Sequence, residues 1–184
     1  MAECSRSFLA SSGKRCPVLV VMAGAPGSGK SYLARTLSLV LDARLIQTDA
    51  VRKELFPEPT YAHQEAAAVY QACHRQIAAA LANGERVVFD GTNLREGPRR
   101  TLYALADHAG ATLLIVVAYA SEAVIRERLR MRAAGHDPAD HSDADWSVYL
   151  RLRGTAEPVL RPHIIANTAV DPLPVIRLLE RHLQ

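Results

Sequence analysis

One short glycine-rich segment constrains the fold of this chain more than any other. Residues 24–31 read Gly-Ala-Pro-Gly-Ser-Gly-Lys-Ser and fit the spacing Gly, four residues, Gly-Lys-Ser. An apolar run over residues 17–23 precedes them, which is typical of a fully buried parallel strand. Apolar residues at helical spacing, Leu33, Leu37 and Leu41, follow the segment. Strand, glycine-rich loop and helix in this order predict a phosphate-binding loop, or P-loop.

The residues of the loop are suited to binding a chain of phosphates. Glycines let successive backbone N–H groups turn inward, and the following helix adds free N–H groups and the positive end of its dipole. Lys30 is expected to reach the β- and γ-phosphates, and the Ser31 hydroxyl is expected to bind Mg²⁺. The alternative is a glycine-rich turn that only joins a strand to a helix. We therefore expect ATP, with GTP as an alternative, and Mg²⁺ as cofactors, and the expected nucleotide-binding residues are Gly24, Ala25, Pro26, Gly27, Ser28, Gly29, Lys30, Ser31, Tyr32 and Asn167.

Composition indicates a single ordinary domain. With 184 residues, 49% of them hydrophobic, the chain can build one large core. The three cysteines lack the spacing of a zinc site or a disulfide framework, which favours a reducing, cytoplasmic location. No apolar run approaches the length of a membrane span, and a net charge of +3 does not by itself indicate a nucleic-acid partner. We expect a loose leader over residues 1–15 and one domain over residues 16–184, with a lid at about residues 121–145.

Apolar runs alternate with helical patterns along the rest of the chain. Runs typical of buried strands lie at residues 17–23, 44–47, 86–89, 112–119 and 163–166. After the P-loop helix, further helices are predicted at residues 50–55, 65–83, 95–108, 121–132, 144–157 and 172–183. This alternation predicts an α/β sandwich with a parallel sheet, in which the most apolar run, 112–119, lies beside the P-loop strand. Asn167 and Thr168 follow the last strand and are expected to contact the nucleotide base.

Two charged residues follow the second predicted strand. Asp49 comes just after the run 44–47. Ligands bind at the carboxyl ends of parallel strands, so Asp49 is expected on the same rim as the P-loop, and Arg52 shares a helix face with it. Asp49 can orient an attacking hydroxyl and take its proton, while Arg52 can hold that carboxylate or a phosphate of the acceptor. The alternative is a helix cap at Thr48 or Asp49 together with a surface ion pair.

The third predicted strand ends in Asp90-Gly91-Thr92-Asn93. A carboxylate at the end of a strand beside the P-loop strand has the position of a Walker B aspartate, which holds Mg²⁺ directly or through water. Ser31 and Asp90 are therefore the predicted metal ligands. Asp90, Thr92 and Asn93 are also predicted to lie on the acceptor side of the phosphates. The alternative is an Asx-turn that leads into the next helix.

Four arginines occupy one helical stretch of the predicted lid. Arg128 and Arg132 stand four residues apart and share one face, and Arg126 and Arg130 form a second such pair. The usual interpretation of such a run is a solvated helix face. Beside a phosphate site we favour a lid in which Arg128 and Arg132 supply positive charge to the transferred phosphoryl group. The polar residues 133–145 are then expected to form a mobile connection between lid helices.

Together these motifs resemble those of small P-loop kinases. The P-loop, Thr-Asp-x-x-Arg at residues 48–52, Asp-Gly-Thr-Asn at residues 90–93 and the arginine-rich helix follow one another in this order. From residue 18 onward the chain is similar to the 5′-hydroxyl polynucleotide kinase group and to the related small predicted kinases of the zeta-toxin-like and AAA_33 types. The resemblance implies a three-layer sandwich like that of nucleoside monophosphate kinases, with a five-stranded parallel sheet in the order 2-3-1-4-5.

The resemblance also implies a role for each motif. Asp49 would act as a base toward the acceptor hydroxyl, and Arg52 would contact a phosphate on the acceptor side. Residues 90–93 would lie beneath the phosphates, and Arg128 with Arg132 would contact the phosphate in transfer. With Lys30 from the P-loop, these residues form the expected catalytic set.

The expected activity is Mg²⁺- and ATP-dependent transfer of the γ-phosphoryl group to an acceptor hydroxyl, which is the activity of a phosphotransferase with an alcohol acceptor. The motifs are specific for phosphoryl transfer and much less specific for the acceptor. The acceptor is therefore open between a nucleic-acid 5′-end and a small molecule: a nucleoside, a sugar, an antibiotic or, as in toxin-type kinases, a nucleotide sugar. The alternative from another class is a regulatory ATPase module that has no acceptor.

Overall fold

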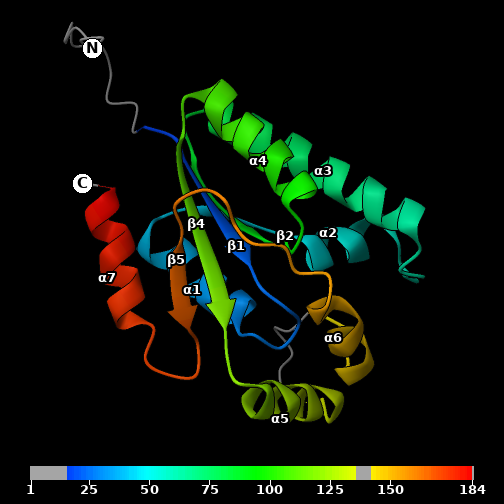
Figure 1. The fold of residues 1–184 in the computed structure, drawn as a ribbon. Coiled ribbons are helices and arrows are strands. Elements are labelled where there is room, and N and C mark those ends of the chain that lie inside the picture. The colour runs from blue at the N-terminus through cyan, green and yellow to red at the C-terminus, as the bar shows by residue number, and fades with distance from the viewer. Residues whose placement is uncertain (1–15, 136–141, 184) are drawn as a thin grey trace, which may run out of the picture.

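The computed structural model describes residues 16–135 and 142–183. Its centre is a parallel sheet formed by β1 (Val18–Ala23), β2 (Arg44–Gln47), β3 (Arg86–Asp90), β4 (Thr112–Tyr119) and β5 (Ile164–Asn167). The strands lie in the order β2-β3-β1-β4-β5 (Figure 1). The predicted fold class and sheet order are therefore confirmed, and each strand begins and ends within one residue of its predicted position.

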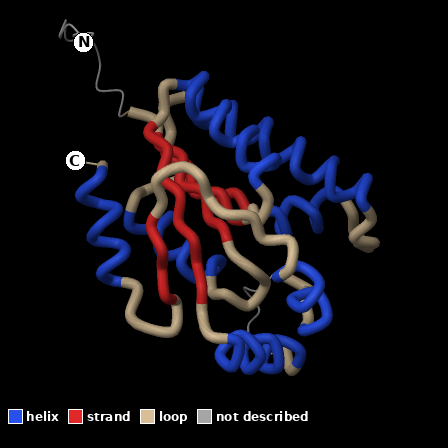
Figure 2. Tube along the Cα trace, in the orientation of Figure 1, coloured by secondary structure: helices blue, strands red, loops and turns tan. Residues whose placement is uncertain are grey.

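Helices cover both faces of the sheet, which makes three layers (Figures 1 and 2). They are α1 (Lys30–Val40), α2 (Thr48–Leu55), α3 (His63–Ala82), α4 (Glu96–Ala109), α5 (Glu122–Ala133), α6 (Trp146–Arg153) and α7 (Leu173–His182). The apolar sides of α3 and α4 share one core with the sheet, and those of α1 and α7 share another. Helices α5 and α6 lie near the carboxyl ends of β1 and β4, with α5 at the bottom of Figure 1 and α6 at its lower right.

Strand β1 is buried along its whole length because it has a core on each side. Leu19 and Val21 join the core beneath α3 and α4, while Val20 and Met22 join the core beneath α1 and α7. Alternate residues of a strand point to opposite faces, which explains the continuous apolar run in the sequence. Burial of each such side chain contributes about 1.5–3 kcal/mol, so the strand is a firm support for the loop that follows it.

Helix α2 begins at Thr48, which is earlier than a helix capped by Thr48 or Asp49 would begin. Its N-cap residue is Gln47 and no side chain caps it, so the predicted cap at Thr48 or Asp49 is wrong. The helix starts directly where β2 ends, which puts both residues in its first turn. There the Asp49 carboxylate interacts favourably with the positive end of the helix dipole.

Helix α6 is shorter than the predicted helix over residues 144–157. The Asp145 carboxylate caps its start by accepting a hydrogen bond from the Val148 N–H (2.9 Å). The buried residue of α6 is Tyr149, whereas Leu150 is exposed. The Asp145 cap determines where α6 begins. The sequence pattern alone did not identify Asp145 as the capping residue.

Part of the prediction falls on residues that the structure does not describe. The leader over residues 1–15 and residues 136–141 of the lid connection lie outside the described ranges. The limits of the domain and the mobility of that connection therefore stay predictions. Within residues 16–135 and 142–183, no helix combines the length and the apolarity that crossing a membrane requires.

Candidate active site

The P-loop joins β1 to α1 at the carboxyl edge of the sheet (Figure 1). Gly24 has φ +151°, and a Cβ at this position would lie 2.5 Å from the carbonyl oxygen of Ala118. Gly29, the N-cap residue of α1, has φ +83°, and a Cβ there would lie 2.7 Å from Thr168 Oγ1. Both positions therefore require glycine, for the backbone conformation and for space. The Gly24 N–H also donates to the Thr92 carbonyl oxygen (3.0 Å), which ties the loop to the end of β3.

A cavity of about 480 Å³ opens between the P-loop, α1 and α5, and we call it the nucleotide-side cavity. Its wall includes most of the nucleotide-binding and lid residues that the sequence predicts: Gly27, Gly29, Lys30, Ser31, Tyr32, Arg128 and Arg132. Asn167 does not line it, and its Oδ1 accepts a hydrogen bond from the Ala169 N–H (3.0 Å). The next residue, Thr168, lines the cavity instead, together with Arg35, which the prediction did not include.

Helix α5 divides its four arginines between two sides. Arg128 and Arg132 line the nucleotide-side cavity, where the lid prediction puts them. Arg126 instead stacks on the indole ring of α6 (4.4 Å to the ring centre), and Arg130 forms an exposed ion pair with a neighbouring glutamate (2.8 Å). The four-residue spacing within each pair accounts for this division. One pair therefore faces the nucleotide-side cavity, and the other belongs to the outer surface of the helix.

Arg128 is held by oxygen atoms of the P-loop region and of the β5–α7 loop. Its Nη2 donates to the Thr168 carbonyl oxygen (2.6 Å), and its Nη1 donates to the Thr168 hydroxyl (2.9 Å) and to the Gly27 carbonyl oxygen (3.4 Å). Burial lowers the pKa of Arg128, but an arginine keeps its proton at neutral pH. Within the described ranges no carboxylate pairs with Arg128, so its positive charge is available to a phosphate.

Replacing Thr168 by valine is expected to lower the free energy of unfolding by about 1–2 kcal/mol. Valine has nearly the same shape, but it removes the hydroxyl that contacts Arg128 and lies 2.5 Å from the Ser28 carbonyl oxygen. Urea unfolding followed by circular dichroism measures the change. Thr168→Ser keeps the hydroxyl and serves as the matched control, which should lose much less. Equal midpoints for the valine variant and the wild type would show that these contacts contribute nothing.

A second cavity of about 400 Å³ meets the first at Lys30, Ser31 and Arg35, and we call it the acceptor-side cavity. Residues from α2, α3, α6 and the end of β3 line it. Asp49 lies in its wall, as predicted from its position after β2. Among the described residues, none donates a hydrogen bond to the Asp49 side chain or forms an ion pair with it. The carboxylate is therefore open to a ligand in this cavity.

Asp90 and Ser31 fit a Mg²⁺ site. Asp90 is only 4% exposed, and its Oδ2 accepts a hydrogen bond from Gln47 Nε2 (3.0 Å). Its Oδ1 is shielded from solvent and has no hydrogen-bond partner among the described residues. Asp90 and Ser31 line the same cavity, and Mg²⁺ usually takes one or two such protein oxygens together with phosphates and water. In the described part of the chain, no three His, Cys, Asp or Glu side chains gather as a separate metal cluster.

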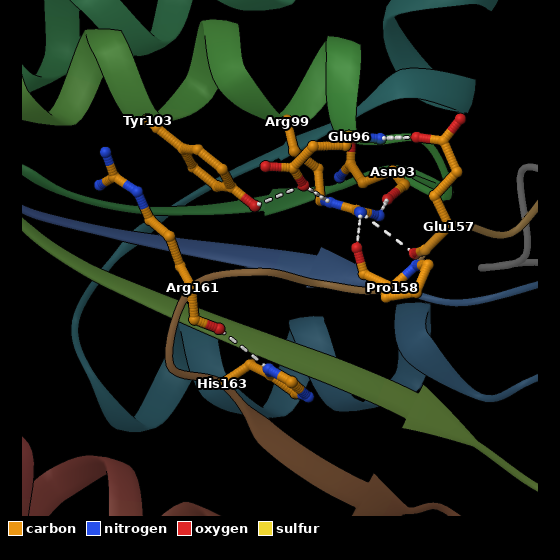
Figure 3. A network of polar contacts seen from close by, with 8 residues as sticks. All are labelled: Asn93, Glu96, Arg99, Tyr103, Glu157, Pro158, Arg161 and His163. Carbon is orange, nitrogen blue, oxygen red and sulfur yellow. Dashed lines mark hydrogen bonds and ion pairs between the residues drawn. The ribbon is translucent and has the colours of Figure 1, made fainter.

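Thr92 and Asn93 have different roles, although the prediction treats them alike. Thr92 lines the acceptor-side cavity. Asn93 is 1% exposed, has φ +44°, and its Nδ2 donates to the Met22 carbonyl oxygen at the end of β1 (2.7 Å). Its own carbonyl oxygen accepts a hydrogen bond from Arg99 Nη1 (2.8 Å), as Figure 3 shows. Asn93 therefore links the P-loop strand to α4 and does not line the acceptor-side cavity.

Arg52 is buried against α3, although it shares a helix with Asp49. Its Nη1 lies 2.5 Å from Glu65 Oε1, and its guanidinium lies over the Tyr61 ring (4.8 Å to the ring centre). Glu65 also accepts hydrogen bonds from the Thr60 N–H (2.7 Å) and hydroxyl (2.8 Å). Burial alone would raise the pKa of Glu65, but these hydrogen bonds outweigh burial and lower that pKa to about 2. The alternative of a surface ion pair between Asp49 and Arg52 is therefore wrong, and the partner is a residue that sequence spacing did not indicate.

Comparisons with known proteins agree with this geometry. A family model described as an AAA domain, AAA_33, matches residues 19–159. The uncharacterized protein Rv2004c of Mycobacterium tuberculosis is 30% identical over 154 residues, which cover 73% of this chain and 31% of the relative. The chain thus spans about a third of the length of the curated relative that it matches.

Solved structures share the fold at lower sequence identity. A protein of Chloroflexus aurantiacus has a TM-score of 0.75 at 22% identity, over 92% of this chain and 100% of that chain. Kti12 of Chaetomium thermophilum, in complex with ADP-AlF3, has a TM-score of 0.70 at 20% identity, over 90% and 99%. The APS kinase CysC of Mycobacterium tuberculosis, in complex with AMPPNP and APS, has a TM-score of 0.67 at 15% identity, over 91% and 98%. The fold is that of P-loop kinases.

Proposed function

The chain belongs to the AAA_33 family, and on this premise we propose that it transfers the γ-phosphoryl group of ATP to a hydroxyl group of an acceptor, with Mg²⁺ as cofactor. The observation that carries the proposal is the meeting of two cavities at Lys30 and Ser31, one beside the P-loop and one beside the open carboxylate of Asp49. A regulatory ATPase needs the first cavity alone. A kinase needs both, with the transferred group between them.

On the nucleotide side, the chain supplies positive charge around the phosphates. Lys30 and the backbone N–H groups of the P-loop bind the phosphate chain, and Arg128 and Arg132 approach it from α5. Phosphoryl transfer depends mostly on positioning and on electrostatic stabilisation of the charge that spreads over the phosphate oxygens. Ser31 and Asp90 would hold Mg²⁺, which would neutralise part of the phosphate charge.

On the acceptor side, Asp49 positions the attacking hydroxyl. The hydroxyl donates its hydrogen bond to the carboxylate, which directs the oxygen lone pair at the γ-phosphorus. The new oxygen–phosphorus bond forms as the bond to the leaving ADP breaks, and the hydroxyl proton passes to the Asp49 carboxylate. The position of Asp49 in the first turn of α2, at the end of β2, supports this role because it holds the carboxylate at the cavity wall.

The ligands of two proteins that share the fold support an adenine nucleotide. Kti12 was solved with ADP-AlF3, and the APS kinase CysC was solved with AMPPNP and APS. The second of these carries a nucleotide and a second ligand together, which is the arrangement that two joined cavities would serve in this chain. The acceptor itself is not carried over from either protein, because identities of 15–20% describe the fold only.

The direct test of the proposal is transfer of label from γ-labelled ATP in the presence of Mg²⁺. The acceptors are 5′-hydroxyl DNA and RNA oligonucleotides beside a panel of nucleosides, sugars and aminoglycosides, and a reaction without acceptor gives the background of hydrolysis. We expect labelled product with at least one hydroxyl compound, and no transfer when Mg²⁺ is removed by chelation. Bound ATP whose slow hydrolysis no hydroxyl compound accelerates would favour the regulatory ATPase instead.

A further inference from the structure

We infer that Glu65 determines the class of acceptor, because it occupies the arginine that would otherwise bind an acceptor phosphate. This inference rests on the proposed function. It assigns to the acceptor-side cavity small hydroxyl compounds without a phosphate group, and it excludes phosphorylated acceptors, nucleic-acid 5′-ends included. The argument concerns Arg52, the residue in the position where related kinases are expected to hold an acceptor phosphate.

The first step is that Arg52 has little left to offer a ligand. The residue is 8% exposed, its Nη1 is bonded to Glu65, and its Nε has no hydrogen-bond partner among the described residues but is shielded from solvent, so a ligand in the cavity does not reach it. Hydrogen bonds from Arg52 and Thr60 keep the pKa of Glu65 at about 2 in spite of burial, so the carboxylate is ionised throughout the range in which enzymes work. The charges of Glu65 and Arg52 therefore cancel, and the pair presents no net positive charge to the cavity.

The second step is that Tyr61 covers a face of the same guanidinium. Its ring centre lies 4.8 Å from the guanidinium carbon, and its hydroxyl donates a hydrogen bond to Asp143. Burial and this carboxylate raise the pKa of Tyr61, so the hydroxyl keeps the proton that it donates. Asp143 in turn lies 3.5 Å from Lys53 Nζ, which anchors the arrangement on α2. The Tyr61 ring therefore covers one face of the Arg52 guanidinium, and Asp143 and Lys53 hold the ring in this position.

The third step concerns the charge and polarity that an acceptor would meet. A phosphate monoester in this cavity would lie beside the Asp49 carboxylate, which lines the wall, and like charges repel strongly in a partly buried site where no net positive charge of the Arg52–Glu65 pair offsets them. Ala66, Tyr70, Val148 and Leu152 contribute apolar surface to the same wall. The cavity therefore suits a compound with one reacting hydroxyl and an apolar or aromatic face.

A different cation of the cavity wall could bind a phosphate of the acceptor in place of Arg52. Lys30 and Arg35 also line the nucleotide-side cavity, where phosphates of ATP require them. Arg151 projects from α6 and is exposed, so it is the residue that could bind an acceptor anion without Arg52. The variant Arg151→Gln separates this possibility from the inferred one.

The experiment measures binding of thymidine and thymidine 3′-monophosphate to the protein saturated with Mg²⁺ and AMPPNP, by titration calorimetry. We expect the wild type to bind the monophosphate more weakly than the nucleoside. Glu65→Gln keeps an oxygen for Thr60 but loses the charge, so it is expected to bind the monophosphate about tenfold more tightly than the wild type. Glu58→Gln removes the same charge from an exposed site in the connection between α2 and α3 and should change neither affinity. Unchanged AMPPNP affinity establishes that each variant is folded.

Two results would overturn the inference. One is a wild type that binds the monophosphate at least as tightly as the nucleoside, and loss of that binding in Arg151→Gln would then identify Arg151 as the anion site. The other is a Glu65→Gln variant with no gain for the monophosphate relative to Glu58→Gln. A failure of the proposed function would look different: AMPPNP would bind and no acceptor would be labelled, while the binding comparison would still decide the role of Glu65.

Discussion

Replacing Asp49 by asparagine is expected to lower kcat for phosphoryl transfer about 10²–10⁴-fold, the range in which a positioned general base contributes. Asparagine has nearly the same shape, but it is uncharged and cannot take the proton of the acceptor hydroxyl. Asp49 lies in the wall of the acceptor-side cavity and not of the nucleotide-side cavity, so AMPPNP affinity should stay within about twofold of the wild type. Single-turnover transfer of label and AMPPNP titration measure the two quantities.

Two variants define what the Asp49 result means. Lys30→Ala is expected to lose both transfer and AMPPNP affinity, because Lys30 lines both cavities. Glu54→Gln removes a carboxylate from the exposed side of the same helix and should leave both quantities unchanged. If Asp49→Asn weakened AMPPNP as strongly as it slowed transfer, Asp49 would be a nucleotide ligand. If it slowed nothing, the acceptor would be positioned by another group.

The layout of the sheet could be predicted from the sequence because it depends on short-range patterns. A strand that is buried on both faces must be apolar at every position, and β1 shows this as an uninterrupted run. Strand β4 is likewise apolar from Leu113 to Ala118, although both of its ends are exposed. Alternation of such runs with helical patterns predicts a parallel sheet with right-handed crossovers. The strand order itself did not follow from these patterns, and it was expected only from the resemblance to small P-loop kinases. The same logic brings Asp49 and Asp90 to one edge of the sheet, because each follows or ends a parallel strand.

The fine structure of the site could not be predicted in the same way because it depends on long-range contacts. Glu65 looks like an ordinary acidic residue in the first turn of α3, and only the packing of α3 against α2 turns it toward Arg52. Asn93 looks like a ligand because it follows Asp90, yet its positive φ directs the side chain to the backbone of β1. The local sequence around Glu65 and Asn93 gave no sign of either role, since each role depends on a partner elsewhere in the sequence.

Arg99 is the clearest case of a role that the sequence did not reveal, and Figure 3 shows how it lies. Its guanidinium donates to the carbonyl oxygens of Asn93 (2.8 Å), Glu157 (3.1 Å) and Pro158 (2.7 Å). Its Nε donates to the Glu96 carboxylate (2.9 Å), and the residue is 1% exposed. One buried side chain thus joins the loop after β3 to the segment that leads from α6 to β5.

Replacing Arg99 by methionine is expected to lower the free energy of unfolding by about 3–5 kcal/mol, which is the usual loss when one partner of a buried charged pair is removed. Methionine fills much of the same space, so the loss reflects the carbonyl oxygens that lose their donor and a Glu96 carboxylate that loses its positively charged partner. Out of a total stability of about 5–15 kcal/mol, this is a large share. Urea unfolding measures it. Arg100→Met makes the same chemical change at an exposed neighbour and should cost less than about 0.5 kcal/mol. Equal losses for the two variants would mean that the network around Arg99 does not hold the loop after β3 in place.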